Sequence, residues 1–127
     1  MRYLLDTHAL IWYFENSSEL PQKIKEIISS TENKKYICSM SFWEIAIKLN
    51  LGKLKVGFTL SELINDVKSR DFNILQIEDE YLNGLSSLPF IHKDPFDRLL
   101  ISTALAESLS IITIDENIQK YDVSWIW

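Results

Sequence analysis

The chain has 127 residues, of which 46% are hydrophobic and only three each are Gly and Pro, so it fits one domain with a sizeable core and is neither disordered nor rich in linkers. Its net charge of −5 argues against a general nucleic-acid binder with a basic face, but not against a nuclease whose acidic site is offset by metal. The single cysteine, Cys38, suits a reducing compartment. With no signal peptide and no long apolar window, the sequence predicts a cytoplasmic protein that does not enter a membrane.

Predicted strands and helices alternate along the chain. In order, we predict a strand at 2–6, helices at 7–14 and 21–30, a strand at 35–39, and helices at 41–52 and 60–69. A strand at 72–77 follows, then helices at 79–88 and 94–110, a strand at 111–115, a helical turn at 116–120 and an edge strand at 123–127. Pro21 is expected in the first turn of the second helix, and Gly52 is expected to cap the third.

This alternation predicts one α/β domain over residues 1–127, with a mainly parallel sheet covered by helices on both faces. In such sheets, functional groups gather at the carboxyl ends of the strands. Asp6 ends the first strand and Asp115 ends the fourth, so both are expected at the same edge. Each also has a purely structural interpretation, Asp6 as a helix N-cap and Asp115 as a turn or helix-start residue.

Glu44 also allows two interpretations. Ser41-x-x-Glu44 has the pattern of a capping box at the start of the third helix, and Glu44 forms an i,i+4 pair with Lys48 in the favourable orientation. Against a purely structural role, the apolar neighbours Trp43 and Ile45 indicate that this part of the helix is partly buried. A buried carboxylate needs a partner.

The stretch "DPFDR" contains two aspartates that need different explanations. Asp94 followed by Pro95 is the expected pair of N-cap and first helical residue. Asp97 then lies in the first turn, where a carboxylate gains from the helix dipole. Because one side chain is enough to cap the helix, Asp97 is the carboxylate left to project towards the edge of the sheet.

Four predicted elements thus place a carboxylate where the element begins or ends near one edge of the sheet. Clustered carboxylates repel one another, so either their pKa values rise or a divalent cation lies among them. Oxygen ligands without a nearby Cys or a pair of His suit Mg²⁺ or Mn²⁺ and argue against zinc. Such a site suits hydrolysis of a phosphodiester by metal-activated water.

The two histidines give weaker signals. His8, two residues after Asp6, is placed to touch a phosphate or a carboxylate, although a lone His is more often a hydrogen-bonded structural residue. His92 lies in the loop before the helix that begins at Asp94 and is placed to pair with that aspartate, in a structural role. There is no Gly-rich phosphate loop and no serine nucleophile elbow.

Four stretches, "LLDTHALIW", "SFWEIAIK", "HKDPFDRLLISTA" and "IITID", resemble the PIN-domain nucleases, and most of all the VapC-type toxins of type II toxin–antitoxin pairs. The resemblance covers nearly the whole chain, in family order. It implies a three-layer α/β/α sandwich and an endoribonuclease dependent on Mg²⁺ or Mn²⁺. It also implies a cognate antitoxin that inhibits the toxin, and a homodimer.

The family's acidic positions carry over to Asp6, Glu44, Asp97 and Asp115, which the resemblance makes both catalytic and metal-binding. Thr7 matches the residue after the first acid, and Thr113 matches the hydroxyl residue before the fourth. His8 replaces an Asn of the broader family, as is common in the toxin branch. Arg98 and Asp94 match features of that branch and are left outside the catalytic set.

The expected reaction is an in-line attack of water on phosphorus with departure of the 3′ oxygen, which leaves 5′-phosphate and 3′-hydroxyl ends. The positive patch that is expected to bind RNA consists of Lys48, Lys53 and Lys55. The alternative is that these lysines only form a solvated surface. Single-stranded or looped RNA fits better than duplex, because unstacked bases meet aromatic and basic side chains.

Two other functions compete with the nuclease. One is a catalytically silent PIN-like interaction module that binds a protein partner. The other is a receiver or phosphatase-like domain with Asp6 as nucleophile, which the sequence disfavours because Thr7 and His8 follow where a second aspartate is wanted. Four aromatic side chains fit either the core or an interface: Trp12, Phe14, Trp125 and Trp127.

Overall fold

A five-stranded parallel sheet forms the centre of the computed structural model, which describes residues 1–127. Its strands lie in the order β3-β2-β1-β4-β5. They are β1 (Arg2–Leu5), β2 (Lys34–Cys38), β3 (Phe72–Leu75), β4 (Ser110–Ile112) and β5 (Trp125–Ile126). The neighbours β1 and β4 pair Leu5 with Ile112, so the residues that follow these two strands emerge side by side.

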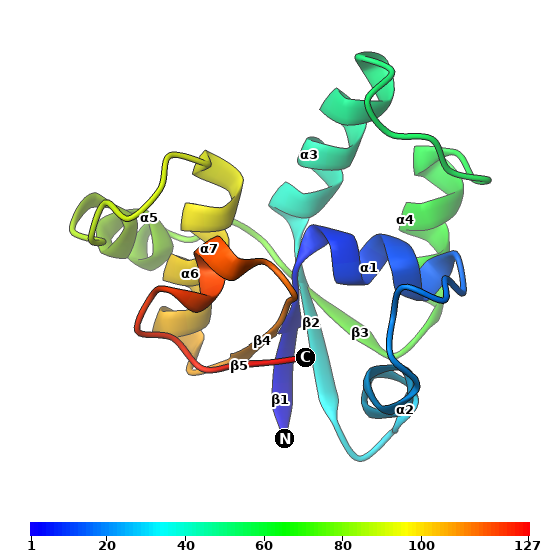
Figure 1. Cartoon of the computed structure of the whole chain (residues 1–127), viewed down its shortest axis with the longest axis horizontal. Helices are drawn as coiled ribbons and strands as arrows, with labels where there is room; N and C mark the ends of the chain where they lie inside the picture. The colour runs from blue at the N-terminus through cyan, green and yellow to red at the C-terminus, as the bar shows by residue number, and fades with distance from the viewer.

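Seven helices cover the two faces of this sheet, which confirms the predicted three-layer α/β/α architecture. They are α1 (Thr7–Phe14), α2 (Gln22–Ser29), α3 (Ser39–Asn50), α4 (Leu60–Ser69), α5 (Asp79–Ser86), α6 (Pro95–Glu107) and α7 (Glu116–Gln119). Figure 1 shows α1 to α4 on one side of the strands and α5, α6 and α7 on the other.

Two apolar clusters, one on each face, hold the layers together. Because side chains alternate along a strand, Tyr3 and Leu5 pack into the cluster with α1, α2 and α4. Leu4 points the other way, into the cluster with α5, α6 and α7. These three side chains are all buried, so a shift of β1 by one residue would exchange its two apolar faces.

The predicted ends of the elements hold to within a few residues, with two corrections. Pro21 is the N-cap of α2 and does not lie inside its first turn. The third helix begins at Ser39, two residues earlier than predicted, directly after the strand residue Cys38. The capping box Ser41-x-x-Glu44 is therefore wrong, because both residues lie within α3. The box forms instead between Thr59 and Glu62, at the start of α4.

The predicted end of α3 is confirmed. Gly52 follows the helix with a φ of +69°, a backbone conformation that glycine adopts without a steric penalty. The amides of Gly52 and Lys53 donate to the carbonyls of Leu49 and Lys48, which satisfies the last turn of the helix. No helix in the structure combines the length and the apolar character that crossing a bilayer requires.

The helices α5 and α6 approach closely where Gly84 faces Ser102. A Cβ atom added at Gly84 would lie 2.7 Å from Oγ of Ser102. That hydroxyl is buried and donates a hydrogen bond to the carbonyl of Tyr81, so it has little freedom to move away.

We expect Gly84→Ala to lower the free energy of unfolding by about 1–2 kcal/mol, because the added methyl group displaces a bonded hydroxyl. Urea unfolding measures this loss. The double variant Gly84→Ala/Ser102→Ala removes the obstructing atom and should recover most of the loss relative to Ser102→Ala alone. Equal losses with and without Ser102 would show that this contact does not set the helix spacing.

Candidate active site

Four helices begin at or near the carboxyl edge of the sheet. Helix α1 follows β1, α3 follows β2 and α7 follows β4, while α6 begins beside them after the loop from α5. Figure 1 shows these helix starts gathered around the upper ends of the strands. Because each helix N-terminus carries a partial positive charge of about +0.5, this edge favours anionic side chains and ligands.

Asp6 connects the end of β1 to the start of α1. Its Oδ1 atom accepts a hydrogen bond of 2.7 Å from the amide of Ala9, so the predicted N-cap is confirmed. The carboxyl is nevertheless only 4% exposed. Burial, together with the negative charges of Asp115 and Glu44, raises the pKa of Asp6 to about 6, against the lowering effect of hydrogen bonds from Thr113 and Ala9. Asp6 therefore caps α1 and also carries a buried carboxyl with a raised pKa.

Glu44 is a buried carboxylate in the second turn of α3. Its Oε1 atom accepts a 2.6 Å hydrogen bond from the hydroxyl of Thr7, and its Oε2 atom accepts one of 2.6 Å from Nζ of Lys48. The predicted pair with Lys48 is thus confirmed. Thr7 joins the starts of α1 and α3, which fixes the direction of the Glu44 side chain.

The two aspartates of "DPFDR" divide as predicted between a cap and a projecting carboxylate. The Oδ1 atom of Asp94 accepts from the amides of Phe96 and Asp97, which confirms Asp94 as the N-cap of α6. Asp97 lies in the first turn and takes no part in capping. Burial raises the pKa of Asp97 to about 6, and the charges of Asp94, Asp115 and Glu44 act in the same direction.

Asp115 and Thr113 follow β4. Asp115 caps α7 through a 2.8 Å hydrogen bond from the amide of Asn117, so its structural interpretation is also correct. The fully buried Thr113 accepts, through its hydroxyl, from the amide of Asp115, and the same hydroxyl lowers the pKa of the Asp6 carboxyl. Thr113 therefore links the acids at the ends of the neighbouring strands β1 and β4.

The four predicted acids lie at the same edge of the sheet, since Thr7, next to Asp6, bonds Glu44, and Asp6 and Asp115 follow the paired strands β1 and β4. The negative charges of Glu44 and Asp115 contribute to the raised pKa values of Asp6 and Asp97. The side chains do not converge fully, however, because no three His, Cys, Asp or Glu residues lie where they would hold one metal ion together. The donor set still fits Mg²⁺, which keeps several waters and usually binds through only one or two carboxylates.

The predicted accessory residues differ in their surroundings. Thr7, Thr113 and Lys48 all touch an acid of the set, as described above. His8 is exposed and packs against Trp12 at 5.5 Å between ring centroids, with no hydrogen bond to Asp6. The prediction of His8 as a hydrogen-bonded structural residue is therefore wrong.

His92 contacts a different aspartate from the one predicted. Its Nε2 atom lies 3.1 Å from Oδ2 of Asp97, whereas the amino-acid sequence suggested a pair with Asp94. The other ring nitrogen lies 2.8 Å from the hydroxyl of Tyr121, a residue that the sequence did not single out. Only the path of the loop before α6 reveals this contact, since Tyr121 follows Asp97 by more than twenty positions.

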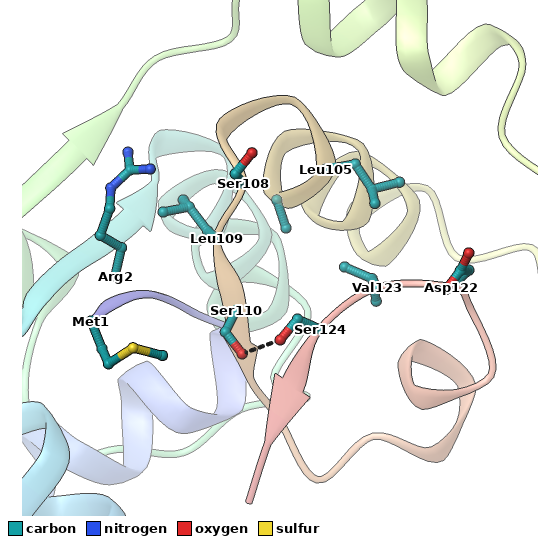
Figure 2. A pocket seen from close by; sticks show the side chains of 10 residues that line it. Met1, Arg2, Leu105, Ser108, Leu109, Ser110, Asp122, Val123 and Ser124 are labelled. Carbon is teal, nitrogen blue, oxygen red and sulfur yellow. Dashed lines mark hydrogen bonds between the residues drawn. The ribbon is translucent and has the colours of Figure 1, made fainter.

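The largest surface groove lies away from the acids. It has a volume of about 690 Å³ and is lined at the amino ends of β1, β4 and β5 by residues such as Arg2, Ser110 and Ser124. Figure 2 shows this groove, with Ser110 and Ser124 hydrogen-bonded across it. Because Asp122 is its only acidic residue and no His or Cys lines it, the acidic edge is the better candidate for an active site.

Comparison with known proteins places these features in a family. The model of the PIN domain matches residues 3–124, while no curated protein sequence matches. The fold is similar to that of VapBC2 from Rickettsia felis bound to a promoter DNA fragment, with a TM-score of 0.76, 16% identity and coverage of 100% of this chain and 99% of that one.

Two further solved structures are similar over nearly the whole chain. FitAcB from Neisseria gonorrhoeae has a TM-score of 0.69 and 18% identity, with 98% of this chain and 96% of that chain covered. A toxin–antitoxin complex from Klebsiella pneumoniae has a TM-score of 0.68 and 16% identity, with coverage of 98% and 96%. At these identities the likeness supports the fold.

The raised pKa of Asp6 predicts how pH changes the stability of the metal-free protein. Because the folded pKa of about 6 exceeds the ordinary value of 3.8, the folded state holds this proton more tightly than the unfolded chain. The resulting stabilisation is complete below about pH 4 and is lost as the pH rises through about 6. Between about pH 5 and about pH 7.5, wild type should lose on the order of 1 kcal/mol relative to Asp6→Asn.

Urea unfolding of metal-free protein at both pH values measures this difference. Asn at position 6 still caps α1, so the variant removes the charge and keeps the cap. Asp66→Asn changes an exposed residue of α4 and serves as the control, with no comparable dependence on pH. A constant difference between wild type and Asp6→Asn would contradict the raised pKa.

Proposed function

This chain belongs to the PIN domain family, and from that premise we propose that it is a Mg²⁺- or Mn²⁺-dependent endoribonuclease and the toxin of a toxin–antitoxin pair. The observation that carries the proposal is the gathering of buried acids at one edge of the sheet, where Asp6 and Glu44 are both nearly inaccessible to solvent and Thr7, next to Asp6, donates to Glu44. A purely structural set of helix caps does not require these carboxylates to be buried beside one another, because like charges destabilise a shared site.

In this proposal, the divalent cation lies among four carboxylates, those of Asp6, Glu44, Asp97 and Asp115. One or two of them would bind it directly, and the others would act through its bound waters. A bound cation of this kind supplies the positive charge that makes water a good nucleophile and stabilises the oxygens of the phosphodiester. Thr7 orients the carboxylate of Glu44 through the hydrogen bond described above, and Thr113 lies beside Asp6 at the ends of the paired strands β4 and β1. The N-termini of α1 and α6 favour the approach of a phosphate, because their free amides and dipoles attract anions.

The proposed substrate is single-stranded or looped RNA. Lys48 lies at the acidic edge and is paired with Glu44. Lys53 and Lys55 are exposed in the turn that follows α3, which extends away from the sheet in Figure 1. These lysines supply local positive charge on an otherwise acidic protein. Single-stranded RNA fits because its unpaired bases expose the faces and edges that side chains recognise.

The proposed protein partners are a cognate antitoxin and a second copy of this chain. The similar structures from Klebsiella pneumoniae and Rickettsia felis contain a toxin–antitoxin complex and VapBC2, respectively. Large apolar side chains such as Trp43 and Phe90 are 61% and 72% exposed, as expected of surfaces that a partner covers. We propose the cytoplasm as the site of action, in agreement with the free and buried Cys38.

A catalytically silent interaction module is the second candidate. One observation favours it, namely that no three potential ligands converge on one point. The salt bridge from Lys48 to Glu44 also favours the silent module, because an ammonium group already neutralises the carboxylate of Glu44. Metal binding and RNA cleavage by the partner-free protein distinguish the two candidates.

We predict that the protein, purified free of any antitoxin, cleaves RNA with Mg²⁺ or Mn²⁺ and not in EDTA. Asp6→Asn and Asp97→Asn should each lower the cleavage rate by about 100-fold or more, since each substitution keeps the shape of the side chain and removes its charge. End analysis of the products should give 5′-phosphates and 3′-hydroxyls.

Asp94→Asn provides the matched control, because Asn retains the cap of α6 on the residue three positions before Asp97. Its cleavage rate should stay within a few-fold of wild type, which would separate the cap from the proposed ligand. Cleavage that survives both EDTA and Asp6→Asn would contradict the metal mechanism. A protein that binds no Mn²⁺ in calorimetry would favour the silent module.

A further inference from the structure

A chain of hydrogen bonds connects Asp97 to the interior of the protein. Oδ2 of Asp97 lies 3.1 Å from Nε2 of His92, and Nδ1 of His92 lies 2.8 Å from the hydroxyl of Tyr121. The same hydroxyl receives a 3.0 Å bond from Nη1 of Arg98 and a 3.3 Å bond from the main-chain amide of His92. Three segments of the chain thus meet at one tyrosine oxygen.

The number of donors at Tyr121 determines the state of His92. A tyrosine hydroxyl accepts two hydrogen bonds and donates one. The guanidinium of Arg98 and the amide of His92 only donate, so they occupy both acceptor positions. The hydroxyl proton of Tyr121 must therefore point to Nδ1 of His92, which accepts it. The imidazole is then neutral, with its own proton on Nε2, and it donates that proton to Asp97.

Arg98 fixes the loop that carries His92. Its guanidinium is buried and donates to the carbonyls of Pro89 and Leu88, and it lies 4.7 Å from the ring centroid of Phe90. Arg98 has no carboxylate partner, although it follows Asp97 directly. Its charge is thus used to hold the loop against α6, and this places the imidazole of His92 beside Asp97.

The two oxygens of Asp97 consequently differ. Oδ2 is held by His92, whereas the chain offers Oδ1 no hydrogen-bond donor. The side chain of Asp97 remains 19% exposed, and Oδ1 is its oxygen without a hydrogen bond. An orienting hydrogen bond to one oxygen of a carboxylate is the arrangement that commonly surrounds metal ligands and tunes their affinity.

We propose that His92 is a positioning residue for Asp97, held as a neutral Nε2–H donor by Tyr121 and Arg98, so that Oδ1 of Asp97 faces the divalent cation. The part of this inference that concerns the cation rests on the proposed function. The hydrogen-bond chain itself is a property of the metal-free protein, and it gives Arg98 and Tyr121 a role in the site without contact with the reacting groups.

A matched pair of variants separates positioning from packing. His92→Phe keeps a planar ring and removes both hydrogen bonds. His92→Gln places an amide N–H donor at about the reach of Nε2. We expect His92→Phe to weaken Mn²⁺ binding by about 10-fold or more in calorimetry, and His92→Gln to recover most of the affinity. Tyr121→Phe, which removes only the hydroxyl that fixes the tautomer, should give an intermediate loss.

Nitrogen-15 NMR of the metal-free wild-type protein gives a second, independent measurement. Near neutral pH it should find Nε2 of His92 protonated and Nδ1 unprotonated. Tyr121→Phe should weaken this preference, while circular dichroism and the unfolding temperature confirm that each variant is folded.

The possible failures are distinguishable. A folded His92→Phe that binds Mn²⁺ as tightly as wild type would overturn the positioning role while the proposed function stands. A proton on Nδ1 of His92 would overturn the hydrogen-bond chain whatever the metal result. If wild type bound no Mn²⁺, the proposed function would fail and the claim that Oδ1 faces a cation would fail with it, even with the expected tautomer.

Discussion

Repulsion between buried carboxylates at the carboxyl edge of the sheet is the constraint around which the site is organised. Asp6 is nearly inaccessible to solvent, and the negative charges of Glu44 and Asp115 contribute to its raised pKa. Such an arrangement destabilises the ionised protein unless the surroundings offset it. Three kinds of group offset this destabilisation. They are the N-termini of the helices that begin at this edge, the hydroxyls of Thr7 and Thr113, and the ammonium of Lys48.

The rest of the fold keeps these groups in place. The two apolar clusters fix the helices on both faces of the sheet, and the pairing of β1 with β4 brings Asp6 near Thr113. The early start of α3 places Glu44 in the second turn, where its side chain meets Thr7. On the other face, Arg98 and Tyr121 hold the loop that brings His92 to Asp97. Glu44 and Asp97 are thus each oriented by a residue from another segment of the chain, whereas Asp6 and Asp115 are held by the amides of the helices that they cap.

Much of this architecture was predictable because it depends on local patterns. The alternation of short apolar strands with amphipathic helices indicated the parallel sheet, and the capping chemistry of Asp94 and Pro95 located the start of α6. Both patterns depend only on residues that are close together in the sequence. The rule that functional groups lie beyond the carboxyl ends of strands groups Asp6 with Asp115 from the sequence alone.

The errors arise where tertiary contacts decide the outcome. Ser41 and Glu44 match a capping box, but β2 ends so close to α3 that the helix begins at Ser39. His92 is nearer in sequence to Asp94, yet the loop anchored by Arg98 turns its ring to Asp97. The role of Tyr121 depends on three segments meeting at one hydroxyl, which no local pattern encodes.

A divalent cation at the acidic edge is the central element of the proposed site. The most direct test is the free energy of unfolding at about pH 7.5, measured with increasing Mn²⁺ for wild type and for Asp6→Asn/Asp97→Asn. We predict that wild type gains stability with the logarithm of the Mn²⁺ concentration, by about 2.7 kcal/mol at 100 times the dissociation constant, and that the double variant gains almost none. Mn²⁺ that leaves wild type unchanged, or stabilises both proteins equally, would contradict it.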